Sequence, residues 1–599
     1  MCGIAGIIGN YNQLDIDNFI KSMAHRGPDG SNFYKNDKFC FIHSLLKIMD
    51  LSENSVQPMA DERNGNIIIF NGSIYNYKEL KVQYFSNTKF KSNTDTEILL
   101  YLYEKFGMDF LKYVKGMFSI ALYDKKYDYI YIIRDRFGIK PLYYFSNSNY
   151  LIFASEIKIL LSHRIVKNSL NLNFNEILNF IAHRLLCGSQ KTLLKNIKVL
   201  EPSKYIKFNL NNNNLNFHTY NYELEKLTLN KKYNQEIFDE QFNKSVKYHT
   251  ITEHKRIACL LSGGLDSSLL ATVLKRQCNN KEIHIFSSLL NTPNEENKNI
   301  KILVKEYNFV HHYLEENSVS FFEDHLKTVK DMDLPTPDAA TTLHNLLCKK
   351  ISKNGFKVVF TGNGGDEFFF GYPLHIYGYL SNLIKMDINK FYLNYKNISK
   401  YSYRESLFLR SFKELLNLKL LNIIKNIQIK LRTKHLDLDE KYFENNYYKN
   451  LSDNLFKNII LNYRDHWGMQ SFLDYEDKNS MAYGIESRVP FMDYDLVDLA
   501  SRISPTQHFE IGSKSLLRKH KIMPINVKNS TNKYGFAANQ NGYIEKYKDK
   551  IKEKIFYEFK NIPLINNDKL IKLLENNHDD YNVFFRTYSY GVWFNNIFN

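Results

Sequence analysis

The side chain near the N-terminus with the clearest potential for chemistry is Cys2, which follows Met1 directly. Removal of Met1 would leave a thiol and a free α-amine on one residue. An α-amine with a pKa of ~7.7–8.0 can activate its own thiol as a base, although a buried structural cysteine is the alternative. Asn71-Gly72 could face a developing oxyanion with an amide and a backbone N–H. Asp95 could hold a substrate ammonium, although alone it would be interpreted as a helix N-cap.

A second chemical signal is the run Ser-Gly-Gly-Leu-Asp-Ser at 262–267, which follows an apolar strand. Its glycines let backbone N–H groups approach phosphate oxygens at a helix N-terminus. The chain contains no Gly-Lys dipeptide, so the Walker-type loop is absent. The 262–267 run, which has Ser and Asp but no Lys, instead suits release of pyrophosphate and hence adenylation of a carboxylate. The run 361–367 adds glycines and a second acid, so Asp266 and Asp366 could hold Mg²⁺ on the pyrophosphate.

The elements that must position Cys2 and Asn71 are short apolar runs separated by turns, which predict strands. Helical periodicity is limited to 15–24 and 95–106, so we expect a mostly antiparallel, layered first domain. An Asn-rich stretch at 209–217 predicts a hairpin near the domain boundary. The expected strands are 3–8, 38–49, 66–72, 117–123, 129–133, 142–145 and 151–153.

After about residue 230 the pattern changes to strands that alternate with helices. Apolar strands are expected at 257–261, 283–290 and 358–360, with a helix at 267–276. Strands that end in glycines predict a parallel sheet with its site at the carboxyl edge. From about 375 onward the pattern is helical. We therefore predict two domains, 2–215 and 230–599.

Composition limits the classes of function. The chain has 599 residues with 44% hydrophobic and 24% charged side chains, which is typical of a globular protein. The net charge of +16 is spread over short patches mixed with acids, so we expect a solvated surface and no nucleic-acid partner. Six cysteines without a Cys-x-x-Cys pair argue against disulfides and structural zinc. With no apolar run near ~20 residues and no signal-type leader, we expect a cytoplasmic protein without membrane contact.

Four segments carry a family resemblance. The segments 1–6, 25–30, 71–76 and 134–144 resemble the N-terminal-nucleophile glutaminase domain of class II glutamine amidotransferases. Together with the 262–267 loop and the segments 475–482, 486–493 and 532–536, they make the chain similar to glutamine-hydrolysing asparagine synthetases over nearly its whole length. The resemblance implies a two-domain α/β fold. An αββα Ntn-hydrolase sandwich would be followed by an α/β ATP-pyrophosphatase (PP-loop) domain.

The resemblance also implies roles for individual residues. Cys2 would attack the glutamine amide, Asn71 and Gly72 would hold the oxyanion, and ammonia would pass through an internal channel. At the second site ATP and aspartate would form an aspartyl-adenylate, with Mg²⁺ and Lys533 balancing the phosphate charge. Glutamine, aspartate and ATP are the implied partners, and a homodimer is left open. The implied glutamine-binding residues are Asn71, Gly72, Ser73 and Asp95; the implied ATP-binding residues are Leu260, Ser262, Gly263, Gly264, Asp266, Ser267, Ser288, Thr361 and Gly362.

Three positions depart from the family pattern. Leu45 stands where the family has an Arg that clamps the glutamine carboxylate, and Ser73 stands where it has a Glu near the substrate ammonium. Asn363 replaces a usual acid. Loss of one charge-assisted contact costs ~1.5–3 kcal/mol. The pocket is therefore either weak or reorganised, with Lys47 as a candidate replacement cation.

Three alternatives remain open from the sequence. The same chemistry could amidate another carboxylate, such as a sugar acid or a secondary metabolite. A tRNA-modifying enzyme with a related loop is less favoured, because that class needs neither Cys2 nor Asn71-Gly72. A catalytically reduced paralogue with a regulatory role is disfavoured by the intact Cys2, Asp266 and Asp366.

Overall fold

The computed structural model describes most of the chain, and two residues singled out from the sequence, Cys187 and Lys533, lie outside the described residues. The 532–536 segment, which was part of the resemblance, lies outside them as well. The described residues are 2–184, 191–220, 229, 231–289, 295–315, 320–399, 407–413, 415–416, 418–437, 449–462, 468–530, 538–576 and 581–598.

The N-terminal part contains two antiparallel sheets, with strand orders β10-β8-β9-β1-β3-β2 and β12-β11-β7-β6-β5-β4. Buried side chains such as Ile4, Phe41, Ile69 and Ile132 pack between them. The predicted strands and the 209–217 hairpin are confirmed. The strands are β1 (Gly3–Ile8), β2 (Gly30–Lys35), β3 (Phe39–Leu45), β4 (Met59–Ala60), β5 (Ile67–Ile74), β6 (Gly116–Asp124), β7 (Tyr129–Arg134), β8 (Tyr143–Ser146), β9 (Leu151–Ala154), β10 (Ile197–Val199), β11 (Lys204–Asn209) and β12 (Asn214–Thr219).

Helices form the outer layers of this sandwich. The helices α1 (Gln13–Met23) and α4 (Ile157–Leu161) pack on the first sheet, and α3 (Asp95–Phe106) packs on β5 of the second. Local sequence explains where they begin: Asn12 caps α1 in a capping box, and the Thr94 side chain accepts an N–H at the start of α3. The layering is αββα, as the resemblance implied. The remaining helices here are α2 (Tyr77–Phe85), α5 (Arg164–Asn168) and α6 (Phe174–His183), with 3₁₀ turns at Glu53–Ser55 and Gly107–Lys112.

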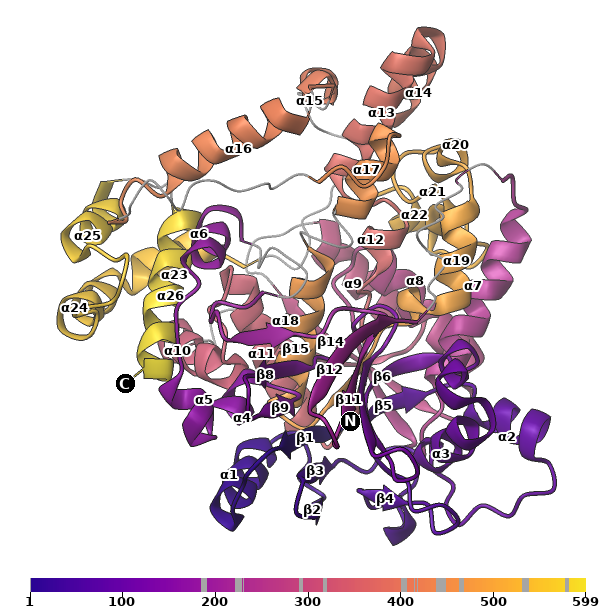
Figure 1. Cartoon of the computed structure of the whole chain (residues 1–599). Helices are drawn as coiled ribbons and strands as arrows, with labels where there is room; N and C mark the ends of the chain where they lie inside the picture. The colour runs from indigo at the N-terminus through magenta and orange to yellow at the C-terminus, as the bar shows by residue number, and fades with distance from the viewer. Residues whose placement is uncertain are drawn as a thin grey trace.

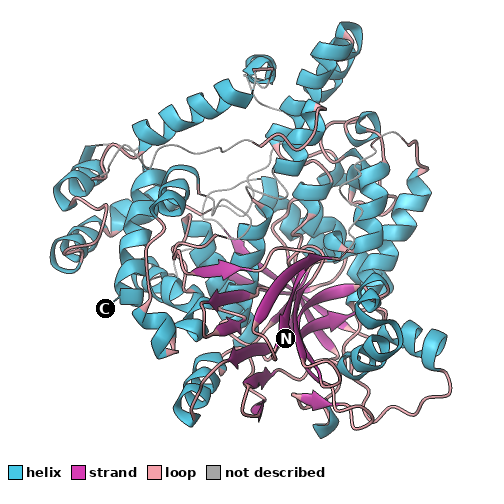
Figure 2. Ribbon diagram, in the orientation of Figure 1, coloured by secondary structure: helices cyan, strands magenta, loops and turns pink. Residues whose placement is uncertain are grey.

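The C-terminal part is built on a parallel sheet with strand order β15-β14-β13-β16-β17, and Figure 2 shows helices on its flanks. The strands are β13 (Arg256–Leu260), β14 (Glu282–Leu289), β15 (Val310–Glu315), β16 (Val358–Phe360) and β17 (Glu486–Arg488). The helices among them are α7 (Gln235–His249), α8 (Leu265–Gln277), α9 (Glu295–Glu306), α10 (Phe321–Met332), α11 (Ala339–Lys353) and α12 (Gly365–Phe368).

Strand β17 corrects the prediction of a wholly helical region after 375. Its three residues, Glu-Ser-Arg, are polar and too few to show a strand periodicity, yet all are buried against β16. Helices account for the rest of this region, and Figure 1 places α14 and α16 at the edge of the molecule away from β2 and β4. Their bounds are α13 (Pro373–Met386), α14 (Ile388–Ser399), α15 (Leu407–Lys413), α16 (Leu418–Arg432), α17 (Leu455–Asn462), α18 (Met469–Met481), α19 (Tyr494–Arg502), α20 (Pro505–His508), α21 (Ser515–Arg518), α22 (Ile525–Lys528), α23 (Gln540–Lys546), α24 (Lys548–Glu558), α25 (Asn567–Asn576) and α26 (Tyr581–Phe598), with a 3₁₀ turn at Pro490–Met492.

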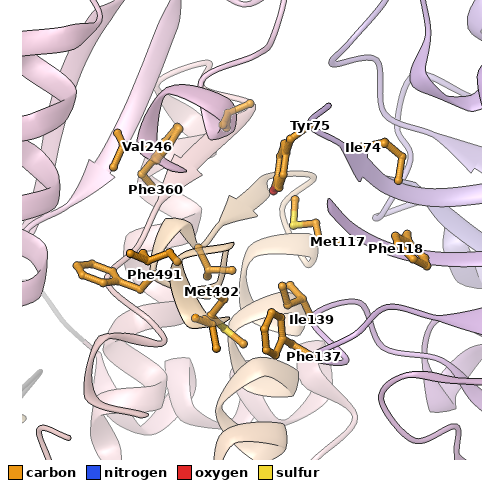
Figure 3. Close-up of a cluster of buried hydrophobic side chains, with 14 of the residues drawn as sticks. Ile74, Tyr75, Met117, Phe118, Phe137, Ile139, Val246, Phe360, Phe491 and Met492 are labelled. Atoms are coloured by element: carbon orange, nitrogen blue, oxygen red, sulfur yellow. The ribbon is translucent and has the colours of Figure 1, made fainter. Parts of the chain in front are cut away.

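One hydrophobic core runs across the junction of the two parts. Figure 3 shows Met117 and Ile139 of the sandwich close to Met492 of the C-terminal part, within one buried cluster. Such continuous burial fixes the relative position of the two parts. Among the described helices, none combines the length and apolar character needed to cross a lipid bilayer.

Candidate active sites

Cys2 is held at the junction by Arg26. The Nε of Arg26 donates to the carbonyl oxygen of Cys2 at 3.2 Å. Nη1 of the same guanidinium lies 2.6 Å from Glu156 and 2.9 Å from Asp477 on α18. Because Arg26 is fully buried with both carboxylates, the backbone of Cys2 is fixed against both parts of the molecule.

The Cys2 thiol is neutral in this environment. The residue is buried, and burial raises the pKa of its thiol, while the charge of the N-terminal amine and the backbone N–H of Leu46 oppose the shift. The negative charges of Glu486 and Asp95 raise this pKa further. A neutral thiol is a weak nucleophile, so attack requires a base close to the sulfur.

Asn71 and Gly72 lie beside Cys2 on β5. The Oδ1 of Asn71 accepts the backbone N–H of Cys2 at 3.1 Å. In the part of the chain that the structure describes, the buried Nδ2 of Asn71 has no hydrogen-bond partner. A Cβ on Gly72 would lie 2.1 Å from the carbonyl oxygen of Met117, so the close approach of β6 requires glycine there. An orphaned buried donor next to a nucleophile is what an oxyanion would satisfy.

Cys2 and Gly72 line a cavity at this junction. Asp95 begins α3 and accepts the backbone N–H of Ile74 at 2.7 Å, while Thr94 takes the N-cap role. Burial raises the pKa of Asp95 to about 7, and the charge of Glu486 adds to this shift. The cavity is lined by Cys2, Leu45, Leu46, Lys47, Ile48, Met49, Asp50, Ser55, Gln57, Phe70, Gly72, Thr94, Asp95, Thr96 and Glu486.

Leu45 and Ser73, two of the positions that depart from the family pattern, each have a charged side chain nearby. Leu45 lines the cavity, and Lys47, two residues on, is the cation among the described lining residues. Its Nζ lies 2.6 Å from Glu53, whose side chain is 86% exposed. The hydroxyl of Ser73 donates to Oε1 of Glu486 at 3.1 Å. Sequence reasoning missed Glu486 as a cavity residue, because nothing in the spacing of β17 indicates contact with a segment 413 residues away.

The 262–267 loop connects β13 to α8 at the carboxyl edge of the parallel sheet. Gly263 has φ +80°, and a Cβ there would lie 2.2 Å from the carbonyl oxygen of Glu296. Gly264 is the N-cap of α8, and the N–H of Ser262 donates to the Ser267 hydroxyl at 3.1 Å. The loop is therefore tight, with backbone N–H groups at a helix N-terminus where phosphate binds favourably.

Two buried hydroxyls lie at neighbouring strand ends. Ser288 is on β14 and Thr361 follows β16, on either side of β13, whose last residue is Leu260. Within the described ranges neither hydroxyl has a hydrogen-bond partner. A Cβ on Gly362 would lie 3.1 Å from Cβ of Asp266, so this turn packs on the start of α8. The structure thus brings the predicted nucleotide-binding residues to one sheet edge.

Asp266 and Asp366 converge on a lysine that the sequence did not single out. The ammonium of Lys514 contacts Asp266 and lies 2.6 Å from Asp366. Although burial opposes its charge, the two carboxylates raise the pKa of Lys514. No local signal marks Lys514, which lies 248 residues from Asp266. A Cβ on Gly371 would clash with Asp366 and Lys514, so this glycine allows the cluster to form.

The paired carboxylates fit the Mg²⁺ that the resemblance implies. They are hard oxygen donors, and Mg²⁺ usually takes only one or two protein carboxylates, with phosphates and water completing its shell. Among the described residues, no group of three or more His, Cys, Asp or Glu side chains able to hold a metal occurs.

Asn363 also has a compensating partner. Its Nδ2 donates to Oε2 of Glu476 on α18 at 2.8 Å. Glu476 accepts the hydroxyl of Ser487 at 2.5 Å, and His344 lies 3.5 Å from the same carboxylate. A carboxylate is therefore present beside position 363, although it comes from another element.

Comparison with known proteins agrees with this two-site layout. Family models match residues 1–222 as a glutamine amidotransferase domain and 238–593 as asparagine synthase. Putative asparagine synthetase [glutamine-hydrolyzing] 2 of Methanocaldococcus jannaschii is 32% identical over 64% of this chain and 78% of its own length. Asparagine synthetase [glutamine-hydrolyzing] 1 of Bacillus subtilis is 27% identical over 97% and 94%. Amidase chry2 of Gibberella zeae is 27% identical over 62% and 59%.

Proposed function

Because the chain belongs to the asparagine synthase family and carries a glutamine amidotransferase domain, we propose that it makes asparagine from aspartate, glutamine and ATP. Glutamate, AMP and pyrophosphate are the other products. The observation that carries the proposal is the buried Nδ2 of Asn71, which has no hydrogen-bond partner among the described residues and lies beside the buried Cys2. The same chain has a glycine-rich loop of the phosphate-binding type at the edge of its parallel sheet. The glutaminase unit is taken as 2–215 and the synthetase unit as 230–599.

The first half-reaction takes place at Cys2. With Met1 removed, the α-amine of Cys2 takes the thiol proton and the sulfur attacks the side-chain amide of glutamine. Asn71 Nδ2 and the Gly72 N–H stabilise the oxyanion, and ammonia leaves. Water then hydrolyses the thioester to glutamate. Asp95, which also lines the cavity, binds the substrate ammonium.

The second half-reaction takes place at the carboxyl edge of the parallel sheet. The 262–267 loop and the hydroxyls of Ser288 and Thr361 orient ATP while the aspartate carboxylate attacks its α-phosphorus and releases pyrophosphate. Asp266 and Asp366 would hold Mg²⁺, which supplies positive charge to the pyrophosphate when bound. Ammonia from the first site displaces AMP, with Lys533 as the proposed further cation.

The residues around Asn363 bear on the identity of the acceptor. The Asn363–Glu476 pair changes the surroundings of the acceptor pocket relative to the family pattern. This favours, as a second candidate, amidation of another carboxylate such as a sugar acid. A cytoplasmic location fits either substrate.

Pyrophosphate release across a panel of carboxylates tests this proposal, with glutamine and ammonium compared as nitrogen donors. We expect release with aspartate and transfer of ¹⁵N from the glutamine amide into asparagine. Release with another acid and none with aspartate would replace the acceptor but keep the chemistry. Absence of glutaminase activity in a folded protein would refute the first half-reaction.

A further inference from the structure

The glutaminase cavity contains a carboxylate from the other part of the molecule. Glu486 lies on β17 of the parallel sheet and lines the cavity together with Cys2, Gly72 and Asp95. It is buried, and its ion pair with Arg488, at 2.6 Å from Nε, together with the charge of Lys140 keeps it ionised. Desolvation acts in the opposite direction, but Arg488, the charge of the N-terminal amine and Lys140 together lower the pKa of Glu486 to about 2. A permanent negative charge is thus present in this cavity at neutral pH.

The contact with Ser73 places the negative charge of Glu486 beside the position where this chain has Ser and the family pattern has Glu. The Ser73 hydroxyl donates to Oε1 of Glu486 at 3.1 Å, so the carboxylate lies directly beside this side chain. Electrostatic effects agree with this position, because the charge of Glu486 acts on both Cys2 and Asp95. Glu486 therefore lies near both the nucleophile and the ammonium-binding acid.

The third acid that lines the cavity, Asp50, already accepts two backbone hydrogen bonds. One of its oxygens accepts the N–H of Ser52 at 2.9 Å, and the other accepts the N–H of Asn93 at 3.0 Å. These bonds hold the loop before α3, so Asp50 has a local structural role. Glu486 instead receives side-chain donors from two elements, Ser73 of β5 and Arg488 of β17.

We propose that Glu486 supplies, from the synthetase domain, the carboxylate that the glutaminase domain lacks at Ser73, and that it binds the α-ammonium of glutamine together with Asp95. The inference rests on the proposed hydrolysis of glutamine at Cys2. It makes the glutamine pocket a shared site that is complete only when the two domains are in contact. Substrate recognition then depends on the position of β17.

The position of β17 also connects the two sites physically. Successive side chains of a strand point to opposite faces, so Glu486 faces the glutaminase cavity and Ser487 faces Glu476 and Asn363. A shift of this strand would move both contacts together. Strand β17 therefore contributes a side-chain contact on each of its two faces.

A comparison of two substrates tests the role of Glu486 in the full-length protein. L-glutamine and 4-carbamoylbutanoate differ only in the α-amine, so a residue that binds this amine should affect only the first. We expect Glu486→Gln to lower kcat/KM for glutamine at least tenfold, mainly through KM, and to change kcat/KM for 4-carbamoylbutanoate less than twofold. An equal loss with both substrates, or a loss confined to kcat, would overturn the proposal.

Three further variants test the same contact, because Glu486→Gln leaves Arg488 without its carboxylate and is at risk of misfolding. Ser73→Ala keeps that ion pair and removes only the hydroxyl that orients Glu486, so a rise in KM of about two- to fivefold is expected for glutamine alone. Adding Ser73→Glu to Glu486→Gln should restore glutamine affinity, whereas Ser73→Glu alone should weaken it through repulsion between two acids. The same sign in both backgrounds would contradict the inference.

Ser487→Ala is the matched control, because it alters the same strand on the opposite face. It should leave the preference for glutamine over 4-carbamoylbutanoate within twofold of the parent.

Failure of the proposed function would give a different result. A parent that hydrolyses neither substrate, or a Cys2→Ala variant that still hydrolyses glutamine, would refute the glutaminase assignment itself.

Discussion

The two sites of this protein differ in how they use charge from distant residues. In the synthetase site, two motif acids, Asp266 and Asp366, keep their expected places and a distant lysine, Lys514, is added between them. In the glutaminase site, Leu45 and Ser73 carry no charge, whereas Lys47 lines the same cavity as Leu45 and Glu486 contacts Ser73. The comparison teaches that a pocket can keep a charge that its own sequence motif has lost, if a charged side chain from another helix or strand lies close enough to the pocket.

The largest expected effect tests whether the two sites divide the reaction. Cys2→Ala should abolish glutamine-dependent asparagine synthesis and spare synthesis from ammonium salts, because the thiol acts only in the first half-reaction. Product formation with each nitrogen donor measures this split. Equal loss of both activities in a folded variant would show that the sites cannot be treated separately.

The next effect tests the acids of the synthetase site. Asp266→Asn and Asp366→Asn should each suppress ATP–pyrophosphate exchange by more than the roughly 10–100-fold typical of lost outer-shell metal partners, since an amide is a poor Mg²⁺ ligand. Asp549→Asn, on the exposed surface of α24, is the control with the same chemical change. Exchange at the parental rate in either site variant would refute the metal assignment.

A smaller effect concerns the carboxylate end of glutamine. Leu45→Arg should lower KM for glutamine roughly tenfold, the value of one charge-assisted pair, and leave ammonia-dependent turnover unchanged. Lys47→Ala should raise this KM if Lys47 already acts as the clamp. If the parent already binds glutamine tightly and Leu45→Arg weakens this binding, Lys47 is the side chain that binds the glutamine carboxylate.

The smallest effect is a pH dependence at the ammonium end. With a pKa of about 7, Asp95 is mostly protonated at pH 6 and mostly ionised at pH 8. KM for glutamine should therefore fall by about tenfold at most over this range, because only the carboxylate attracts the ammonium. Asp95→Asn should give a high and pH-independent KM between these values. A KM that rises with pH in the parent would contradict the assignment.

The raised pKa also has a consequence for stability. In the unfolded chain Asp95 ionises near pH 4, whereas in the folded protein it holds its proton until about pH 7. The group therefore lowers the free energy of unfolding progressively as pH rises between these two values. Asp95→Asn removes this cost, and thermal melting of parent and variant at pH 5 and pH 8 measures it.

The sequence was a good guide to the fold where local patterns were strong. The expected 95–106 helix matches α3, because Thr94 caps it and apolar residues recur along its buried face. β17 was missed because three polar residues carry no periodicity, and their burial depends on β16 beside them. The residues Cys2, Asn71 and Asp95 were likewise predicted from type and local spacing. The structure places Cys2 and Asp95 at one cavity and Asn71 in hydrogen-bond contact with Cys2.

What the sequence by itself determined is the presence of two chemistries: a cysteine nucleophile after Met1, and a glycine-rich turn with acids at the end of an apolar strand. Only the tertiary structure decided which charges complete each pocket. Lys514 reaches Asp266, and Glu486 reaches Ser73, across hundreds of residues. The physical reason is that catalytic motifs are local in the chain, whereas electrostatic interactions depend on distance in space, which only the packing of the domains fixes.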